Sequence, residues 1–290
     1  MSAAAEPTAA VGTGRDLLRR ILGQPSAVLG GIIVLVIATI AILSPWIAPM
    51  DYRQTDMLAV WEPPGGDFLL GADQLGRDVL SRLIVGARVS LLVALSVLAI
   101  AVVAGTTLGM LAAWYGRWVD SVVMRTADIT FAFPELIIAI LVAAMLGPGL
   151  TSTIVALSLV SWPGIARLTR SLVLSIRQEL YIEAALACGT PTRTILLRHC
   201  LPNIMPALIV RVSVGIGFVI MAEATLSFLG LGVQEPVPSW GGMIRDGLTA
   251  LRTDPHMAFA ASAALGLAII GCNLLGDGLR DLLDPRLAAR

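Results

Sequence analysis

The sequence predicts an all-α, polytopic membrane protein. Of its 290 residues, 57% are hydrophobic and only 14% are charged, and the mean hydropathy is +0.85. A soluble domain is usually about 45–50% apolar and about 25% charged. Apolar runs recur along the chain at the length that a helix of about 20 residues needs to cross a bilayer. A β-barrel would show short alternating segments instead. We therefore expect six transmembrane helices.

The expected spans follow one another with polar segments between them. A tail, 1–24, precedes a transmembrane domain, 25–290. An amphipathic stretch over 121–130 leads into the third span, and Pro163 predicts a kink in the fourth. The spans are expected at 27–47, 89–114, a segment ending near 146, 151–168, 205–230 and 257–275. A cleaved signal peptide is the alternative for the first run. It is disfavoured because the run is longer than a signal core and no clear cleavage site follows.

Arginine placement predicts the orientation in the membrane. Polar loops are expected at 50–88 and 233–255 on one side, and at 172–204 and 276–290 on the other. With the N-terminus inside, 13 arginines fall in cytoplasmic segments and 6 fall outside. Arg211, early in the fifth span, can extend toward the cytoplasm. This asymmetry satisfies the positive-inside rule, so both tails and the loop 172–204 are expected in the cytoplasm.

The cytoplasmic loop 172–204 predicts a hairpin of two short helices. Its first helix is expected over 177–188, which contains no helix breaker. Gly189 can end that helix with a positive φ. Thr190 can cap the second helix, with a proline in its first turn. That helix is expected to stop near residue 200, because Pro202 disfavours helical geometry in the residue before it.

Catalysis is nearly excluded by composition. All 20 basic residues are arginines, so the chain lacks the lysine that a phosphate-binding P-loop requires. Neither the two histidines nor the three cysteines have the spacing of a metal site. The net charge is zero, which gives no basic surface for nucleic acid. We expect no catalytic residue, no metal and no cofactor bound by this chain.

Five stretches carry a family resemblance. Glu183-Ala184-Ala185, then Gly189, then His199-x-Leu201-Pro202 resembles the EAA loop of ABC importer permeases. The other stretches are similar to the dipeptide, oligopeptide and nickel subfamily of these permeases, although Ala72 stands where threonine is common. They are LGADQLGRDVLSR at 70–82, LSFLGLG at 226–232, PSWGGM at 238–243 and GDGLRDLLDPR at 276–286.

The resemblance implies a type I ABC importer permease fold of the C-type and a set of partners. These are a sister permease, two ATPase subunits that hold ATP and Mg, an external substrate-binding protein and the lipid bilayer. The hairpin would act as coupling helices, and its small side chains would let it sit in a groove of the ATPase. An ordinary amphipathic hairpin is the alternative. The residues expected at the ATPase contact are Tyr181, Glu183, Ala184, Ala185, Gly189, Arg193, His199, Leu201 and Pro202.

Three acidic residues lie in or near the expected spans. Glu223 lies well inside the fifth span, where a carboxylate is costly and suggests function. It could line the substrate pathway, or it could form a hydrogen bond between helices. Glu135 suits the start of a helix, and Asp277 is expected at the interface. In the second outer loop, Trp240 is expected to be partly exposed. Trp240 and Met243 could contact the binding protein, although Trp240 could instead anchor at the membrane interface.

Two other classes of membrane protein are weighed against the permease. A secondary transporter needs paired broken helices in its two halves, and the sequence shows none. An intramembrane enzyme needs a nucleophile and a base, and no such pair is evident. A purely structural anchor leaves the outer motifs unexplained. Dipeptides, oligopeptides, nickel chelates and glutathione all remain open as substrates.

Overall fold

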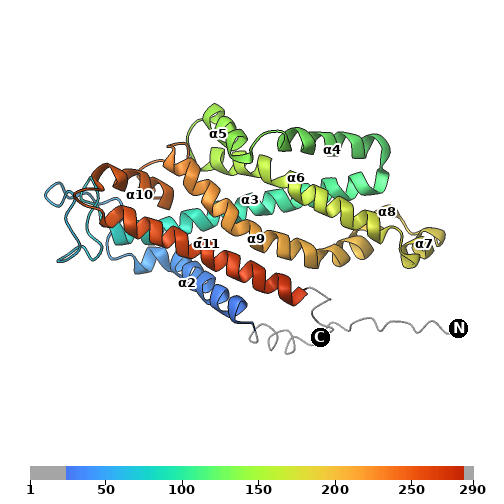
Figure 1. Cartoon of the computed structure of the whole chain (residues 1–290), viewed down its shortest axis with the longest axis horizontal. Coiled ribbons are helices and arrows are strands. Elements are labelled where there is room, and N and C mark those ends of the chain that lie inside the picture. Colours follow the sequence, from blue (N-terminus) through green and yellow to red (C-terminus); the bar gives the residue numbers. More distant parts are fainter. Residues whose placement is uncertain (1–23, 284–290) are drawn as a thin grey trace.

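The computed structural model describes residues 24–283, and Figure 1 shows them as a bundle of long helices. The all-α prediction is confirmed, since every regular element in this range is a helix apart from two isolated β-bridges. The predictions for 1–23 and 284–290 lie outside the described residues. The elements are α2 (Pro25–Ile47), α3 (Val79–Tyr115), α4 (Arg117–Phe131), α5 (Glu135–Leu146), α6 (Leu150–Ile176), α7 (Leu180–Ala187), α8 (Thr192–Thr194), the π-helix η1 (Ile195–Cys200), α9 (Leu201–Phe228), α10 (Trp240–Gly247), the 3₁₀-helix η2 (Leu248–Ala250) and α11 (His256–Leu283).

Four helical stretches are long and apolar enough to cross a membrane. They are α2, α3, the run from α8 through α9, and α11, and the bent pair α4–α5 can make a fifth. The remaining long helix, α6, has 27 residues, or about 40 Å. Its length suffices, but its serines, threonines and two arginines make it more polar than the others. The structure thus supports four to five spans by length and composition alone.

The third expected span is not a single helix. α4 and α5 meet at an angle of 92°. Pro134 stands directly before α5 and disfavours helical geometry in Phe133. α5 has only 12 residues, or about 18 Å, which is too short to cross a hydrocarbon core of about 30 Å. The apolar run over 135–146 therefore belongs to a bent pair with α4, which is either a broken span or a re-entrant loop.

The second span begins ten residues earlier than predicted. Val79 to Arg88, expected in the outer loop 50–88, form the start of α3. The side chain of Asp78 accepts a hydrogen bond of 2.8 Å from the backbone N–H of Ser81, which caps the new helix. The prediction missed this start because Arg82 and Arg88 were read as loop residues. Arg82 is in fact buried.

The first half of the hairpin is shorter than predicted and ends as expected. α7 begins at Leu180 instead of residue 177. Gly189 has φ of +72°. Its N–H bonds the carbonyl of Leu186 at 3.0 Å, and the N–H of Thr190 bonds that of Ala185 at 3.0 Å. These two hydrogen bonds together form the Schellman motif that commonly ends a helix.

The second half of the hairpin differs from the prediction. Its N-cap is Pro191 and not Thr190. The helix also does not end near Cys200. It continues through Pro202 and Pro206 as part of one 37-residue run over 192–228. A proline clashes with the carbonyl four residues before it. Here the turn is widened, and the N–H of Leu201 bonds the carbonyl five residues back. The π-helical turn thus carries the chain past Pro202.

Two further polar segments are partly helical. The predicted loop 233–255 contains α10 and η2. The tail predicted at 276–290 is wrong at its start, because α11 continues as far as Leu283. α10 begins where the side chain of Ser239 accepts a hydrogen bond of 3.2 Å from the N–H of Gly242. The polar composition of both segments hid their helical geometry.

Small residues allow the long helices to approach closely. α3 and α6 share the most extensive helix contact. Gly105 and Gly109, four residues apart on α3, face Ile165 and Ala166 of α6. Close approach over small residues is typical of membrane helices. α11 packs against both α2 and α9, so it lies between them.

The chain alternates between the two ends of the bundle. Figure 1 places the loop 48–78 and α10 at one end, and α7 at the other. The larger core cluster joins α2, α3, α5, α6, α9, α10 and α11, whereas the second core joins α3, α6, α7, η1 and α9 near the hairpin. The hairpin is therefore built onto the bundle by a core of its own.

Replacing Gly109 with alanine is expected to destabilise the chain. The added Cβ would lie 2.5 Å from the carbonyl oxygen of Ala166 and 2.8 Å from Cβ of Thr169. Overpacking of this kind costs about 1–3 kcal/mol. The melting temperature of the purified chain in detergent is expected to fall. Gly266→Ala is the control, because its Cβ would meet nothing within 4 Å. Equal melting temperatures for the two variants would contradict the proposed packing.

Candidate coupling surface and outer ion-pair cluster

The hairpin is fixed to the bundle by one deeply buried side chain. Ile182 of α7 is fully buried and belongs to the second core, together with Val173 of α6 and Ile195 of η1. Burial of one such side chain contributes about 1.5–3 kcal/mol. A helix of eight residues is too short to be stable alone. The position of α7 therefore depends on this packing.

Polar contacts reinforce the attachment. The amide of Asn203 donates to the carbonyl of His199 at 2.6 Å and to the hydroxyl of Tyr181 at 3.4 Å. The rings of Tyr181 and His199 lie with centroids 6.4 Å apart. Burial raises the pKa of Tyr181, and the nearby acidic groups of Cys200 and Glu179 raise it further. Tyr181 is thus a neutral phenol that ties α7 to α9.

The base of the hairpin is bound to the end of α3. Arg177 donates to the carbonyls of Ala113 and Trp114 at 3.3 and 3.1 Å. Its guanidinium also lies 5.5 Å from the centroid of the Trp114 ring. Unpaired carbonyls at a helix C-terminus attract a cation. Arg177 was not predicted as a site residue, although its place after the fourth span was visible.

The outward face of α7 combines apolar and charged groups. Leu180 is 80% exposed and Leu186 is 46% exposed. Of the predicted contact residues, those that are exposed are Tyr181, Glu183, Ala184, Gly189, Arg193 and Pro202. Those that are half-buried are Ala185, His199 and Leu201. Large exposed apolar side chains beside small ones form a face that a partner can cover.

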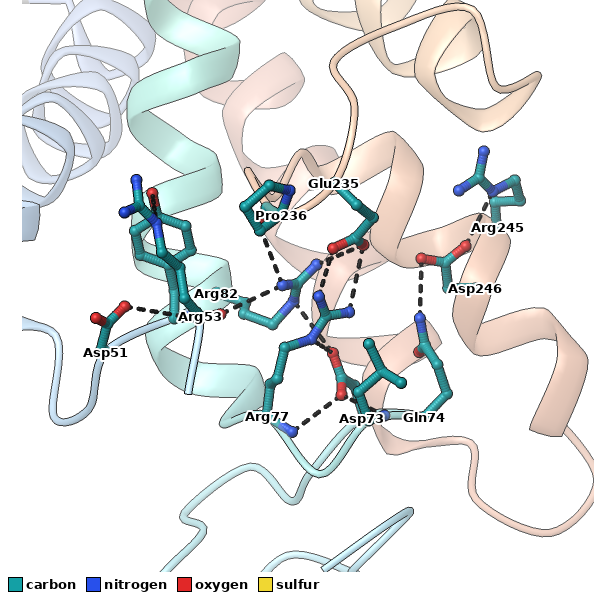
Figure 2. A network of polar contacts seen from close by, with 12 residues as sticks. Asp51, Arg53, Asp73, Gln74, Arg77, Arg82, Glu235, Pro236, Arg245 and Asp246 are labelled. Carbon is teal, nitrogen blue, oxygen red and sulfur yellow. Dashed lines mark hydrogen bonds and ion pairs between the residues drawn. The ribbon is translucent and has the colours of Figure 1, made fainter. Parts of the chain in front are cut away.

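At the opposite end, a cluster of four charged side chains joins the two outer loops (Figure 2). Asp73 is fully buried, and its carboxylate accepts from the Nε of Arg77 at 2.7 Å. Arg82 of α3 is 1% exposed, with its Nε 3.3 Å from the same carboxylate oxygen. The geometry at that Nε makes an ion pair without a hydrogen bond. One buried carboxylate thus lies within ion-pair distance of two buried arginines.

Glu235 completes the cluster from the loop after α9. It accepts from the Nη2 of Arg82 at 2.9 Å and pairs with the Nη1 of Arg77. Burial alone would raise the pKa of Glu235, but the hydrogen bond from Arg77 and the charge of Arg82 hold it below its ordinary value. Burial would lower the pKa of Arg77, whereas its bonds to Glu235 and Asp73 raise it. Glu235 and Arg77 therefore stay charged.

Other residues of the 70–82 stretch also fix its geometry. The backbone N–H groups of Leu75 and Arg77 donate to Asp73 at 2.8 and 3.0 Å, which closes a tight turn. Gly76 in that turn has φ of +67°. The hydroxyl of Ser81 donates to Asp78 at 2.6 Å and accepts from the N–H of Met50 at 2.9 Å. This motif is a structural brace for the outer loops.

Trp240 and Met243 are buried, so the expectation that Trp240 is partly exposed is wrong. They are 2% and 1% exposed. The indole N–H of Trp240 donates to the carbonyl of Leu83 at 3.0 Å, which binds α10 to α3. A tryptophan in a polar loop was read as a surface residue, but the ring fills the space left by Gly86. A direct contact of either side chain with a partner would require this packing to open.

Glu223 is fully buried between helices. One of its carboxylate oxygens accepts from Ser90 of α3 at 2.9 Å, and the other accepts from Ser227 of α9 at 2.7 Å. Intramembrane acids need such partners. The geometry favours the helix-to-helix hydrogen bond over the substrate pathway. The serines at 90 and 227 were not recognised in the sequence as hydrogen-bond partners of Glu223.

A cavity of about 330 Å³ lies between α3, α5, α6 and α9. Its two charged lining residues are Glu135 of α5 and Arg211 of α9. Glu135 was expected at a helix start and Arg211 early in the fifth span, extending toward the cytoplasm, and nothing in the sequence predicted that both would line one cavity. Within residues 24–283, no group of three or more His, Cys, Asp or Glu side chains is arranged to hold a metal.

Comparison with known proteins gives two matching family models and several relatives. Residues 105–289 match the binding-protein-dependent transport system inner membrane component, and residues 12–64 match the N-terminal TM domain of oligopeptide transport permease C. The glutathione transport system permease protein GsiD of Pectobacterium atrosepticum is 42% identical over 276 residues, which cover 94% of this chain and 91% of that protein. The dipeptide transport system permease protein DppC of Alkalihalophilus pseudofirmus is 37% identical, with 96% and 91% covered. GsiD of Escherichia coli is 40% identical, with 94% and 90% covered.

Removing the charge of Asp73 is expected to destabilise the chain far more than removing an exposed carboxylate. Asp73→Asn leaves two buried arginines with one partner, and breaking a buried pair costs about 3–5 kcal/mol. Asp128→Asn is the control, because its pair with Arg167 is 64% and 51% exposed and such pairs contribute at most about 1 kcal/mol. Thermal unfolding in detergent measures both. Similar losses of melting temperature would rule out a stabilising role for the cluster.

Proposed function

This chain belongs to the family of binding-protein-dependent transport system inner membrane components, and we propose that it forms half of the translocation pathway of an ATP-driven importer of small peptides. It is a transport permease of the inner membrane and not itself an enzyme. Membership in the family implies an ATPase and a binding protein as partners. The observation that supports a coupling role best is that α7 is packed firmly onto the bundle and still exposes one face at its surface.

The substrate class follows from what the relatives share. The names of two of them specify glutathione and dipeptide transport, and both are similar to this chain at 42% and 37% identity over nearly their whole length. Dipeptides and glutathione are both small, with an amino and a carboxyl group at their ends. We therefore assign small peptides as the substrate class. The choice among individual peptides belongs to the binding protein.

The hairpin is suited to transmit force from an ATPase. α7 is anchored by Ile182, and the second half of the hairpin continues without a break into α9. A movement of the ATPase against this surface is therefore transmitted to a helix that extends along the bundle. Rigid-body movement of packed helices is a usual route for such transitions. The exposed leucines and Glu183 give the ATPase both apolar and charged contacts.

A topology of six spans accounts for the whole bundle. In addition to the four apolar helices and the bent pair, α6 is proposed as a span, because the extensive contact with α3 covers its polar side. Six crossings leave both chain ends and the hairpin on one side, which the arginine distribution assigns to the cytoplasm. The outer loops, braced by Asp73 and Glu235, then face the binding protein. A sister permease and two ATPase subunits complete the proposed assembly.

The broken α4–α5 span does not favour a secondary transporter. Those proteins build their sites from corresponding broken helices in two repeats. Within residues 24–283, only one pair of helices that together are long and apolar enough for a span has a bend of more than 40° at a short break. ATP-driven import remains the function that the geometry supports best.

Thiol labelling tests the orientation. Cys188 in α7 is exposed, whereas Cys200 and Cys272 are buried, so an impermeant maleimide is expected to modify one site. With the chain expressed without its ATPase, labelling should occur in inside-out vesicles and not in right-side-out vesicles. Leu58→Cys in a Cys188→Ser background is the matched control. Leu58 is 99% exposed in the outer loop, so it should label in the opposite set. Labelling of Cys188 from the outside would refute the topology.

Changing the outward face of α7 tests the coupling role. Combining Glu183→Arg with Leu186→Glu should reduce copurification of the ATPase by at least about tenfold, because charge reversal at a contact adds repulsion and an apolar contact is lost. ATP-dependent peptide uptake should fall with it. Neither side chain is buried, so the melting temperature should stay unchanged.

Leu58→Glu is the control for the second substitution. It places the same charge on an exposed leucine at the opposite end of the bundle. ATPase copurification with this variant should equal that of the unmodified chain. If the α7 variant also retains its ATPase and its uptake, the hairpin is not the coupling surface.

A further inference from the structure

The cavity between α3, α5, α6 and α9 carries two opposite charges on otherwise apolar and small residues. Its lining comprises Leu98, Glu135, Ser161, Gly164, Ile165, Arg211, Val214, Gly215, Phe218 and Val219. Glu135 is half-buried and Arg211 is exposed at the surface of this single chain. Its volume of about 330 Å³ falls within the roughly 300–1,000 Å³ of small-molecule sites.

Two glycines make room for the guanidinium of Arg211. A Cβ on Gly164 of α6 would lie 3.2 Å from its Nη2, and a Cβ on Gly215 of α9 would lie 3.8 Å from its Nη1. The guanidinium therefore rests over bare backbone at the α6–α9 contact. Gly164 belongs to the Trp162-Pro163-Gly164 stretch that predicted a kink. Its lack of a side chain lets the guanidinium of Arg211 lie close to α6.

Neither charge is neutralised within the described part of the chain. Among residues 24–283, Arg211 and Glu135 take part in no ion pair within 4.0 Å and in no side-chain hydrogen bond that meets normal geometry. Arg170 of α6, by contrast, pairs with Asp120 of α4. Charged groups inside a membrane span are expensive and usually face a functional cavity or a partner.

We propose that this cavity is a transit site for the two charged ends of a small peptide. This inference rests on the proposed function. Arg211 would bind the terminal carboxylate through its planar pair of N–H donors, and Glu135 would bind the terminal ammonium. The apolar walls, including Phe218 and Ile165, would contact side chains without selecting among them. A site of this kind recognises what all small peptides share.

The position of the two charges on different elements supports a site that changes during transport. Glu135 stands at the start of α5, directly after the 92° break. Arg211 stands on α9, in the same continuous helix as the hairpin. Movement of α9 by the ATPase would change the distance between the two charges. The peptide would then be held in one state and released in the other, as transport requires.

Uptake per ATP hydrolysed tests the site. The complete importer, with its sister permease, ATPases and binding protein, is reconstituted in liposomes. Radiolabelled reduced glutathione and alanyl-alanine serve as probes. Arg211→Gln and Glu135→Gln should each reduce uptake by at least about tenfold, the loss expected for one charge-assisted contact. ATP hydrolysis stimulated by the loaded binding protein should stay within about twofold, so that transport becomes uncoupled.

Three further variants separate binding from structure. Arg211→Lys keeps the charge but not the paired N–H donors, so it should retain more uptake than Arg211→Gln. Arg125→Gln removes an exposed arginine on α4 and should change neither readout. The double variant Arg211→Gln with Glu135→Gln should transport no better than either single variant. If the two residues only neutralise each other, the double variant should instead recover uptake, and the proposal would fail.

The remaining outcomes are also decisive. Unchanged uptake per ATP in both single variants overturns the transit site but leaves the proposed function intact. A parallel loss of uptake and ATP hydrolysis in Arg211→Gln, with no rescue by Arg211→Lys, shows a structural role and also overturns it. No uptake of either peptide by the unmodified importer would instead refute the proposed function, and the transit site with it.

Discussion

The continuity of one helix is the constraint on which the rest of the structure depends. The run over 192–228 has 37 residues and extends about 55 Å. At one end it carries half of the hairpin and the core residue Ile195, and further along it carries Arg211 and the buried Glu223. Two prolines lie within it, and the π-helical turn before Pro202 removes the clash that would otherwise break it. A break there would separate the hairpin from the bundle.

The outer end solves a different problem, because two polar loops must hold their shape without a core of useful size. The apolar cluster there has only three buried members, Ala59, Phe68 and Ala72. Ion pairs, in place of an apolar core, hold the two loops in shape. Asp73 and Glu235 both pair with Arg77 and Arg82, and Glu235 follows the two arginines by 158 and 153 residues in sequence. Burial strengthens these attractions while it penalises any unpaired member. The brace therefore fixes the end of α3 relative to the loop after α9.

Sequence reasoning predicted what composition and local geometry control. It placed the apolar spans, the positive φ of Gly189 and the exposed face of the hairpin. It failed where long-range contacts override local signals. Arg82 looked like a loop residue because its partners, Asp73 and Glu235, could not be known to lie beside it. Trp240 looked exposed because its neighbour Leu83 is far away in sequence.

The cavity and the hairpin are connected by one continuous helix. Arg211 follows His199 by 12 residues on the same helix, about 18 Å along its axis. A helix of this kind is stiff in its long direction, so a displacement imposed at the hairpin reaches Arg211 with little loss. Glu135 belongs to α5, which the break at Pro134 uncouples from α4. One charge of the cavity thus lies on the helix that continues from the coupling surface, and the other lies on a separate helix after the break. An arrangement of that kind can convert a push from outside the membrane into a change of affinity inside it.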